Sequence, residues 1–349
     1  MPDYRLSILE IYREFTLRCL HDDPDLFILS AVEDCSLRRI AYLPSWVPDF
    51  SVPLTCSPLP YPHLDVMVPY TASGKSKLHV TWSEANPDCA ILQGHQVDVI
   101  GRVLTIESPA QLPDIIQPIT TFTRDFPFKY CTGELKTDAL WRTLTANVAN
   151  APSYKYPAPE LFSEFFAVYC NEGVIVDDTH LEHLQLRDET DYGNHQRTHP
   201  HADSSPSRDY PQRQGHDDQS IYASDPPKLS ATSEDPSTID STSANETGDH
   251  GGSQVRYESQ DFQAAVSRAT RERKFFTTEH KRYGIGPQSI QEGDLVFLFA
   301  GGRVPYILRP SQSIGKTTFT FVGECYCHGL CEGQAFSESG VIWQDVQLE

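Results

Sequence analysis

Apolar residues that recur three and four positions apart predict an amphipathic helix near the start of the chain. Its apolar stripe consists of Ile8, Ile11, Tyr12, Phe15 and Cys19. Ser7 and Glu10 match a capping box, in which the side chain of each residue bonds the backbone amide of the other. Asp22-Asp23-Pro24 ends the pattern, because proline cannot continue a helix.

Three further stretches carry helical periodicity. Residues 137–148 begin with a capping Thr137 or Asp138, and their apolar face holds Leu140, Trp141, Leu144 and Val148. Residues 158–170 have an aromatic face, interpreted as core, of Leu161, Phe162, Phe165, Phe166 and Tyr169. The last helix is marked by Phe262, Ala265, Val266 and Ala269. We interpret the basic run Arg268–Lys274 as a solvated helix end, with an interaction patch as the alternative.

Alternating and continuous apolar runs predict strands. Residues 77–82 alternate, and two further strands, 89–94 and 97–104, are separated by Gly94, so that together they suggest a small antiparallel unit. After Gly284-Ile285-Gly286-Pro287 the strands follow closely, at 295–302, 304–309 and 317–329. The fold class is therefore α+β, with helices, small antiparallel units and a C-terminal small β-sheet or partly closed barrel.

A long polar tract divides the chain. Residues 187–254 contain isolated apolar residues without a period, too few to offset the chain entropy of folding, so we expect a disordered acidic linker. The predicted organisation is a helical and β region at 1–186, the linker at 187–254, and a C-terminal helix plus β module at 255–349.

The segment Leu43–Phe50, with the sequence LPSWVPDF, places a tryptophan between two prolines. Pro44 and Pro48 restrict the backbone to extended geometry, so the segment loses little entropy when it is held in place. We predict that Trp46 anchors an internal strap and is largely buried. The alternative is a polyproline-type ligand for another protein, but the prolines do not have the PxxP spacing.

Charge and cysteine usage limit the function classes. The chain has 349 residues and a formal net charge of −20, which disfavours nucleic acid and anionic membrane surfaces as partners. No apolar run is long enough to span a bilayer, and the charged first residues do not form an export signal. Nine scattered cysteines indicate reduced thiols rather than a disulfide framework, so we expect a cytoplasmic protein.

Motifs for chemistry are weak. Cys325, Cys327, His328 and Cys331 are zinc-ligand types, but a site normally uses two separated pairs, so we predict buried thiols with zinc as the alternative. The phosphate-loop pattern around Gly315 fails because Pro310 replaces its first glycine. Neither G-x-S-x-G nor H-E-x-x-H occurs. We expect no cofactor and no enzymatic activity, although residues brought together by folding could form a hydrolase site.

Three stretches in order resemble one family. They are DYRLSILEIYREF near the start, LPSWVPDF, and the C-terminal run from Arg273 to Phe336. They resemble the region that follows the conserved domain of fungal heterokaryon incompatibility (HET-domain) proteins. The motif positions expected to be structural are Trp46, Gly293, Asp294, Arg309, Glu324, His328 and Gly329.

The resemblance implies a function. In the family a HET domain precedes this region, and here Tyr4 already belongs to the helix that follows it, so we expect a truncated chain that lacks the HET domain. The implied role is a non-enzymatic interaction or regulatory region in nonself recognition and programmed cell death. The implied partner is a protein, with an isolated HET domain as one candidate. The alternatives are a zinc-binding β module and a decayed gene product without a function of its own.

Overall fold

The computed structural model describes residues 5–22, 25–63, 65–83, 86–106, 111–170, 250–311, 317–338 and 341–349. Most of the predicted linker, residues 187–249, lies outside the described residues. Its last five positions are the exception, because they belong to a helix that begins at His250.

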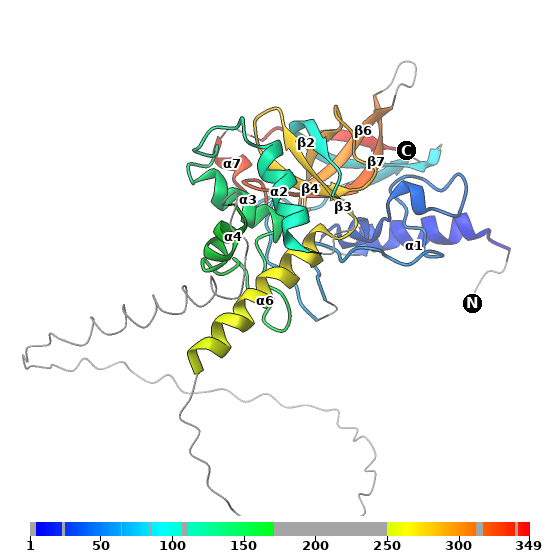
Figure 1. Ribbon diagram of the computed structural model, residues 1–349. Helices are drawn as coiled ribbons and strands as arrows, with labels where there is room; N and C mark the ends of the chain where they lie inside the picture. Colours follow the sequence, from blue (N-terminus) through cyan, green and yellow to red (C-terminus); the bar gives the residue numbers. More distant parts are fainter. Residues whose placement is uncertain are drawn as a thin grey trace, which may run out of the picture.

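In the view of Figure 1, the helices lie below the strands or beside them. They are α1 (Ile8–Asp22), α2 (Leu112–Phe122), α3 (Lys136–Leu144), α4 (Phe162–Cys170), α6 (His250–Thr270) and the short α7 (Ala335–Glu338), with 3₁₀ turns at Phe27–Ala31 and Cys35–Leu37. The predicted helices near 8, 137, 158 and 262 are confirmed. The cap predicted at Thr137 or Asp138 is wrong, because α3 begins at Lys136 with Leu135 as its N-cap and without a side-chain cap. Helix α2 was not predicted, and it contains two prolines, Pro113 in its first turn and Pro118 inside it.

The predicted cap of helix α1 is present, but only part of its predicted apolar stripe is covered. The backbone amide of Ser7 donates to Glu10 Oε2 at 2.7 Å, and the Glu10 amide donates to Ser7 Oγ at 3.3 Å. Tyr12 and Cys19 pack against the core. Three other members are exposed by about half, with fractions of 58% for Ile8, 45% for Ile11 and 51% for Phe15.

The strands form one mixed, mostly antiparallel sheet. They are β1 (Val80–Ser83), β2 (Asn86–Leu104), β3 (Arg273–Thr278), β4 (Tyr283–Pro287), β5 (Leu295–Phe299), β6 (Tyr306–Ser311), β7 (Thr318–Glu324), β8 (Tyr326–Cys327) and β9 (Gln344–Leu348). Their order is β5-β6-β7-β9-β2-β3-β4-β8, and β2 also pairs with β5. Strands β2, β5, β6, β7 and β9 therefore close into a ring, as the predicted partly closed barrel requires.

The two predicted strands on either side of Gly94 are one continuous strand, β2, so the prediction of separate strands is wrong. Gly94 is the residue at which β2 changes partner, because it pairs with Gln344 of β9 and also with Phe299 of β5. A Cβ at this position would lie 2.8 Å from Val346 and 3.0 Å from Phe299. Glycine thus allows the strand to turn the corner of the ring rather than end there.

Aromatic side chains fill the inside of the ring. The ring centroids of Phe299 and Tyr306 are 5.3 Å apart, and those of Tyr306 and Phe321 are 5.8 Å apart. On the other side of Figure 1, helices α2, α3, α4 and α6 gather beside β3 and β4. Phe162 of α4 joins this helical group by edge contacts with Trp141 of α3 and Phe262 of α6. The aromatic face predicted for 158–170 is therefore core, as expected.

Strand β2 belongs to the first part of the chain, whereas β3, β5 and β9 belong to the last part. Its pairing with all three builds segments that are distant in sequence into one sheet. In the described part of the chain, no helix combines the length and apolar character needed to cross a membrane.

Candidate functional site

The strap Leu43–Phe50 lies against the ends of two strands of the ring. Trp46 is completely buried, and its Nε1 donates to the Asp88 carbonyl at 3.0 Å. The Ser45 amide donates to the carbonyl of Glu349 at 2.9 Å, and Ser45 Oγ accepts from the Phe321 amide at 2.8 Å. The strap therefore connects β7 and the end of β9 to the first part of the chain.

The strap is not extended throughout as predicted, because it turns at Ser45 and Trp46, where the Val47 amide donates to the Pro44 carbonyl at 3.0 Å. Two side chains, Arg38 and the buried Asp49, hold this shape. The guanidinium of Arg38 donates to the carbonyls of Pro44, at 2.9 Å, and Ser45, at 2.5 Å. Asp49 Oδ2 accepts from the amides of Arg39, at 2.7 Å, and Ile40, at 3.0 Å. Burial alone would raise the pKa of Asp49, but these bonds, with those from the Ser51 side chain and amide, lower that pKa to about 2. Asp49 is thus an ionised cap for the strap at neutral pH.

Two motif residues, Asp294 and Arg309, form a two-pronged ion pair. Arg309 Nε donates to Asp294 Oδ1 and Nη2 donates to Oδ2, both at 2.8 Å. The Gln291 amide also donates to Asp294 Oδ2 at 2.8 Å, so the carboxylate closes the turn before β5 and joins it to β6. Hydrogen bonding to Asp294 raises the pKa of Arg309. Fork-to-fork geometry makes this pair specific for arginine.

Another motif residue, Glu324 at the end of β7, bonds the first part of the chain. Its Oε1 accepts from the Leu59 amide at 2.7 Å and from Arg273 Nη2 at 3.1 Å. Arg273 Nη2 also donates to the Ser57 carbonyl at 2.8 Å. Burial raises the pKa of Glu324, although the charge of Arg273 opposes the shift. The pair binds the loop around residues 57–59 to the sheet.

Arg273 also corrects a prediction. The basic run Arg268–Lys274 was interpreted as a solvated helix end, but Arg273 has only 2% of its surface exposed. Arg268 Nη2 donates to the carbonyls of Thr145, at 3.3 Å, and Val148, at 3.0 Å. Both guanidiniums thus satisfy buried acceptors inside the protein. A run of charges in sequence does not show that its positions alternate between core and solvent.

The motif residue His328 lies in a chain of hydrogen bonds that joins the last part of the chain to the first part. We call the contact between these two parts the junction. Its Nδ1 is 2.9 Å from the Tyr326 hydroxyl, and its Nε2 is 2.8 Å from Glu134 Oε1. Because an ionised carboxylate only accepts, Nε2 carries a proton, and in the neutral imidazole Nδ1 then accepts from the Tyr326 hydroxyl. Burial would raise the pKa of Glu134, but hydrogen bonds from His328 and Thr132 lower it.

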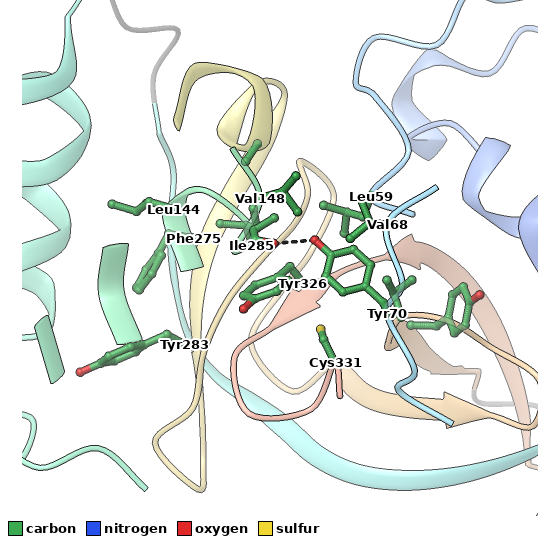
Figure 2. Packing of buried hydrophobic residues seen from close by; sticks show 14 of the residues in the cluster. Leu59, Val68, Tyr70, Leu144, Val148, Phe275, Tyr283, Ile285, Tyr326 and Cys331 are labelled. Atoms are coloured by element: carbon green, nitrogen blue, oxygen red, sulfur yellow. Dashed lines mark hydrogen bonds between the residues drawn. The ribbon is translucent and has the colours of Figure 1, made fainter. Parts of the chain in front are cut away.

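Figure 2 shows the cluster of buried hydrophobic residues that contains Tyr326. Tyr70, from the loop after the strap, lies beside Tyr326, and their ring centroids are 6.1 Å apart. The Tyr70 hydroxyl donates to the Ala146 carbonyl at 2.5 Å. Other side chains converge there from several elements, namely Leu59, Val68, Leu144, Val148, Phe275, Tyr283, Ile285 and Cys331. The motif histidine therefore borders a core shared by both parts of the chain.

A hydroxyl, an imidazole and a carboxylate in a row also form the arrangement of a nucleophile with its base. Here the hydroxyl belongs to Tyr326, which is 2% exposed. Burial raises the pKa of Tyr326 well above its ordinary value, which disfavours the phenolate. The described arrangement is suited to holding β8 and the loop at residue 134 together.

The three clustered cysteines are divided between two apolar clusters. Cys325 and Cys327 belong to one apolar cluster, whereas Cys331 belongs to the other. Burial raises the pKa of each of these thiols. Both ring nitrogens of His328 already have partners. Across the described ranges, no three His, Cys, Asp or Glu side chains are grouped so as to hold a metal ion, so the geometry offers no support for the zinc alternative.

The two motif glycines are required by backbone shape. Gly293 has φ +88° in the turn that leads to Asp294, and Gly329 has φ +81° just after His328. Side chains with a Cβ rarely adopt these values. A Cβ on Gly329 would also lie 2.8 Å from the Thr132 methyl group. Both glycines therefore place the adjacent motif side chain.

Sequence reasoning did not identify Glu134, Arg273 or Asp49 as members of these networks. Glu134 is 194 positions from His328, and no local pattern relates the two. For Asp49 a signal existed, because aspartate after proline in a rigid segment is suited to accepting backbone amides. The motif residues Trp46, Asp294, Arg309, Glu324 and His328 were named from resemblance, and each makes a contact described above.

Comparison with known proteins identifies the C-terminal module. Residues 238–339 match the family model of the Het-6 beta-barrel domain. Within the described residues, the matched range holds strands β3 to β8 but not β2 or β9, which complete the ring. No solved structure matches the chain.

A curated relative supports the same identification. The "Heterokaryon incompatibility protein 6, OR allele" of Neurospora crassa is 39% identical over 59 residues. The match covers 17% of this chain and 9% of the length of the relative. The chain is therefore related to fungal heterokaryon incompatibility proteins, as its motifs indicate, through a region that matches the Het-6 beta-barrel domain.

Proposed function

We propose that this chain acts as a non-enzymatic interaction and regulatory region of a heterokaryon incompatibility protein. The observation that carries the proposal is the position of the motif residues. Glu324 and His328 of the last part bond Leu59 and Glu134 of the first part. The strap that holds Trp46 bonds Glu349 and Phe321 of the last part through Ser45. Residues that hold two segments in one arrangement are suited to presenting a surface to a partner.

The buried polar networks support a structural rather than a chemical role. The Asp294 carboxylate is fully engaged by Arg309 and the Gln291 amide, and the His328 ring is engaged on both sides. Catalytic groups need access to a substrate in a cleft. Two cavities beside described residues lie along α2 and beside the end of α1, and neither of these two is lined by the motif residues.

The proposed partner is a protein, and the HET domain of a related incompatibility protein is the first candidate. The net charge of −20 disfavours phosphate-bearing ligands, since like charges repel over a Debye length. The role in nonself recognition and cell death is part of this proposal, because the matched relative is far longer than the matched stretch.

Purified full-length chain and a purified HET domain from a related protein provide the test. We expect saturable binding by biolayer interferometry at about 150 mM salt, with a Kd of roughly 1–100 μM, as is typical of transient regulatory contacts. An unrelated protein of similar net charge serves as the control. Equal responses from the control and the HET domain would contradict the proposed partner.

The non-enzymatic part has its own test. The Tyr326→Phe variant keeps the ring and removes the hydroxyl that faces His328. Wild type and variant are compared for hydrolysis of ester, phosphoester and peptide substrates. Turnover by the wild type that falls at least about 100-fold in the variant, as removal of a nucleophile predicts, would overturn the proposal.

A further inference from the structure

A groove lies beside the end of α1, away from the junction networks. It has a volume of about 650 Å³. Its floor and one wall come from consecutive residues, Ser76 to Val80, and Trp82 lies at the end of this run. The opposite wall is the last turn of α1, with Leu20, His21 and Asp22. A groove that follows five consecutive residues has the shape of an extended chain.

The wall of the groove is the edge of the sheet. Among the described strands, β1 pairs with β2 alone, so its other side carries no neighbouring strand. The residues before β1 leave backbone groups open as well. Successive amides of an extended segment point to opposite sides, so only those of Lys77 and His79 can share one edge. Within the described part of the chain, neither donates a hydrogen bond to another backbone group. The Leu78 backbone packs instead against Gly301, where a Cβ would lie 2.9 Å from the Leu78 nitrogen. An unpaired edge with open amides is a template for an added strand.

The alternation along this edge specifies what an added strand would carry. Leu78 and Val80 pack partly against the core, whereas Lys77, His79 and Thr81 are exposed. Successive side chains of a strand point to opposite faces, and directly opposite side chains on neighbouring strands interact. A partner strand would therefore meet apolar side chains on one face and Lys77 and His79 on the other.

The charge of the groove differs from that of the whole protein. Lys77, His79 and His21 line it, and the exposed Lys75 lies two residues before Lys77. Lys77 carries the one fixed positive charge among the lining residues, and the Oδ1 atom of Asp22, the one acid among them, lies 3.0 Å from His21 Nδ1. In a chain with a net charge of −20, this edge attracts acidic side chains.

We propose that the edge formed by residues 77–83 binds an extended acidic segment of a partner protein by strand addition. The bound segment alternates apolar residues, which face Leu78 and Val80, with acidic residues, which face Lys77 and His79. Trp82, with 44% of its surface exposed, provides an aromatic contact at the end of the groove. The inference rests on the proposed interaction function and names the chemistry of a partner surface that the junction does not supply.

The probe is a fluorescein-labelled ten-residue peptide of alternating valine and glutamate, flanked by serines for solubility. Fluorescence anisotropy with the full chain measures its affinity at about 50 mM and 300 mM salt. We expect saturable binding that weakens at the higher salt. A twin peptide with lysine in place of glutamate is expected to bind at least about threefold more weakly, from the reversed cross-strand charge pair at Lys77. Equal affinities of the two peptides, or binding of neither, would overturn the proposal.

A charge swap on the chain provides the matched test. The Lys77→Glu/His79→Glu variant is expected to lose the glutamate peptide and to gain the lysine twin, each by about tenfold. Lys155→Glu, an exposed lysine on another loop, is the control and is expected to leave both affinities unchanged. Circular dichroism confirms that each variant is folded. An unchanged preference in the double variant would show that the edge is not the site.

A change in the peptide backbone distinguishes binding by strand addition from binding by charge attraction alone. A glutamate peptide methylated on alternate backbone nitrogens keeps its charge but cannot donate along one edge. We expect its binding to be lost. Undiminished binding would overturn the strand mechanism. A failure of these peptide experiments leaves the HET-domain binding test unaffected, so the two proposals fail separately.

Discussion

The Trp46→Ala variant tests whether the strap fastens the two parts of the chain together. Trp46 is completely buried, and its indole Nε1 supplies the hydrogen bond to the Asp88 carbonyl at the start of β2. Truncating a buried tryptophan to alanine typically costs about 3–5 kcal/mol, because the lost apolar contacts leave a cavity that relaxes only in part. The Asp88 carbonyl also loses its donor, which adds roughly 1 kcal/mol.

We therefore expect the free energy of unfolding to fall by about 4–6 kcal/mol. For a folded region of this size, that loss corresponds to a drop in Tm of roughly 8–20 °C. Urea denaturation followed by far-ultraviolet circular dichroism measures the change. Trp46→Phe separates the two contributions, since it keeps most of the apolar contact but removes the donor to Asp88.

Trp82→Ala is the matched control, because Trp82 is 44% exposed. Its expected cost is below about 1 kcal/mol, as for surface positions in general. The strap reasoning would be refuted by a Trp46→Ala cost below about 1 kcal/mol, or by equal costs for the two tryptophans.

Two further predictions concern the strap and the sheet. Asp49→Asn removes a carboxylate whose pKa is about 2 in the folded protein against an ordinary value of 3.8. Because the pKa is lowered in the folded protein, the carboxylate stabilises the fold above the unfolded pKa, near pH 4, and this stability is lost as the pH falls toward 2. The variant is therefore expected to be less stable than wild type by about 2 kcal/mol at pH 7 and to approach wild type near pH 2 in urea titrations. A difference in stability that does not change with pH would contradict this account. Gly284→Ala places a Cβ 2.2 Å from the Phe276 ring, so we expect a loss of roughly 1–3 kcal/mol from overpacking in thermal denaturation. Gly101→Ala is its control, because the nearest atom lies 3.5 Å away in ordinary contact, and similar losses in both variants would show that the ring contact is not the cause.

Local pattern was sufficient where the physical cause was itself local. The Ser7 and Glu10 cap depends on residues three apart, and the aromatic face of α4 follows from helical spacing. Prediction failed at Gly94, where a glycine between two apolar runs suggested a break. A glycine can mark either a turn between two strands or a bend within one strand of a ring. The two cases differ only in which strands pair with the residues around the glycine.

The candidate site shows the same division. Trp46, Glu324 and His328 could be named from motifs, because their residue types and their order along the chain resemble a family. Their partners could not be named, since Glu134 and Asp88 become neighbours only when distant segments meet. The exposed half of the α1 stripe is a further case, because periodicity shows that Ile8 and Phe15 share a face but not whether that face is covered.

By itself, the sequence determined four of the helices, several of the strands, the proline-bounded strap, the polar tract and the acidic balance, since propensity, spacing and charge act over a few residues. Only the tertiary structure decided that β2 joins three strands from the end of the chain, that Arg273 is buried and paired with Glu324, and that one edge beside α1 stays open. Hydrogen bonding between strands and burial of charges depend on contacts between residues far apart in the chain, and a one-dimensional pattern contains no record of those contacts.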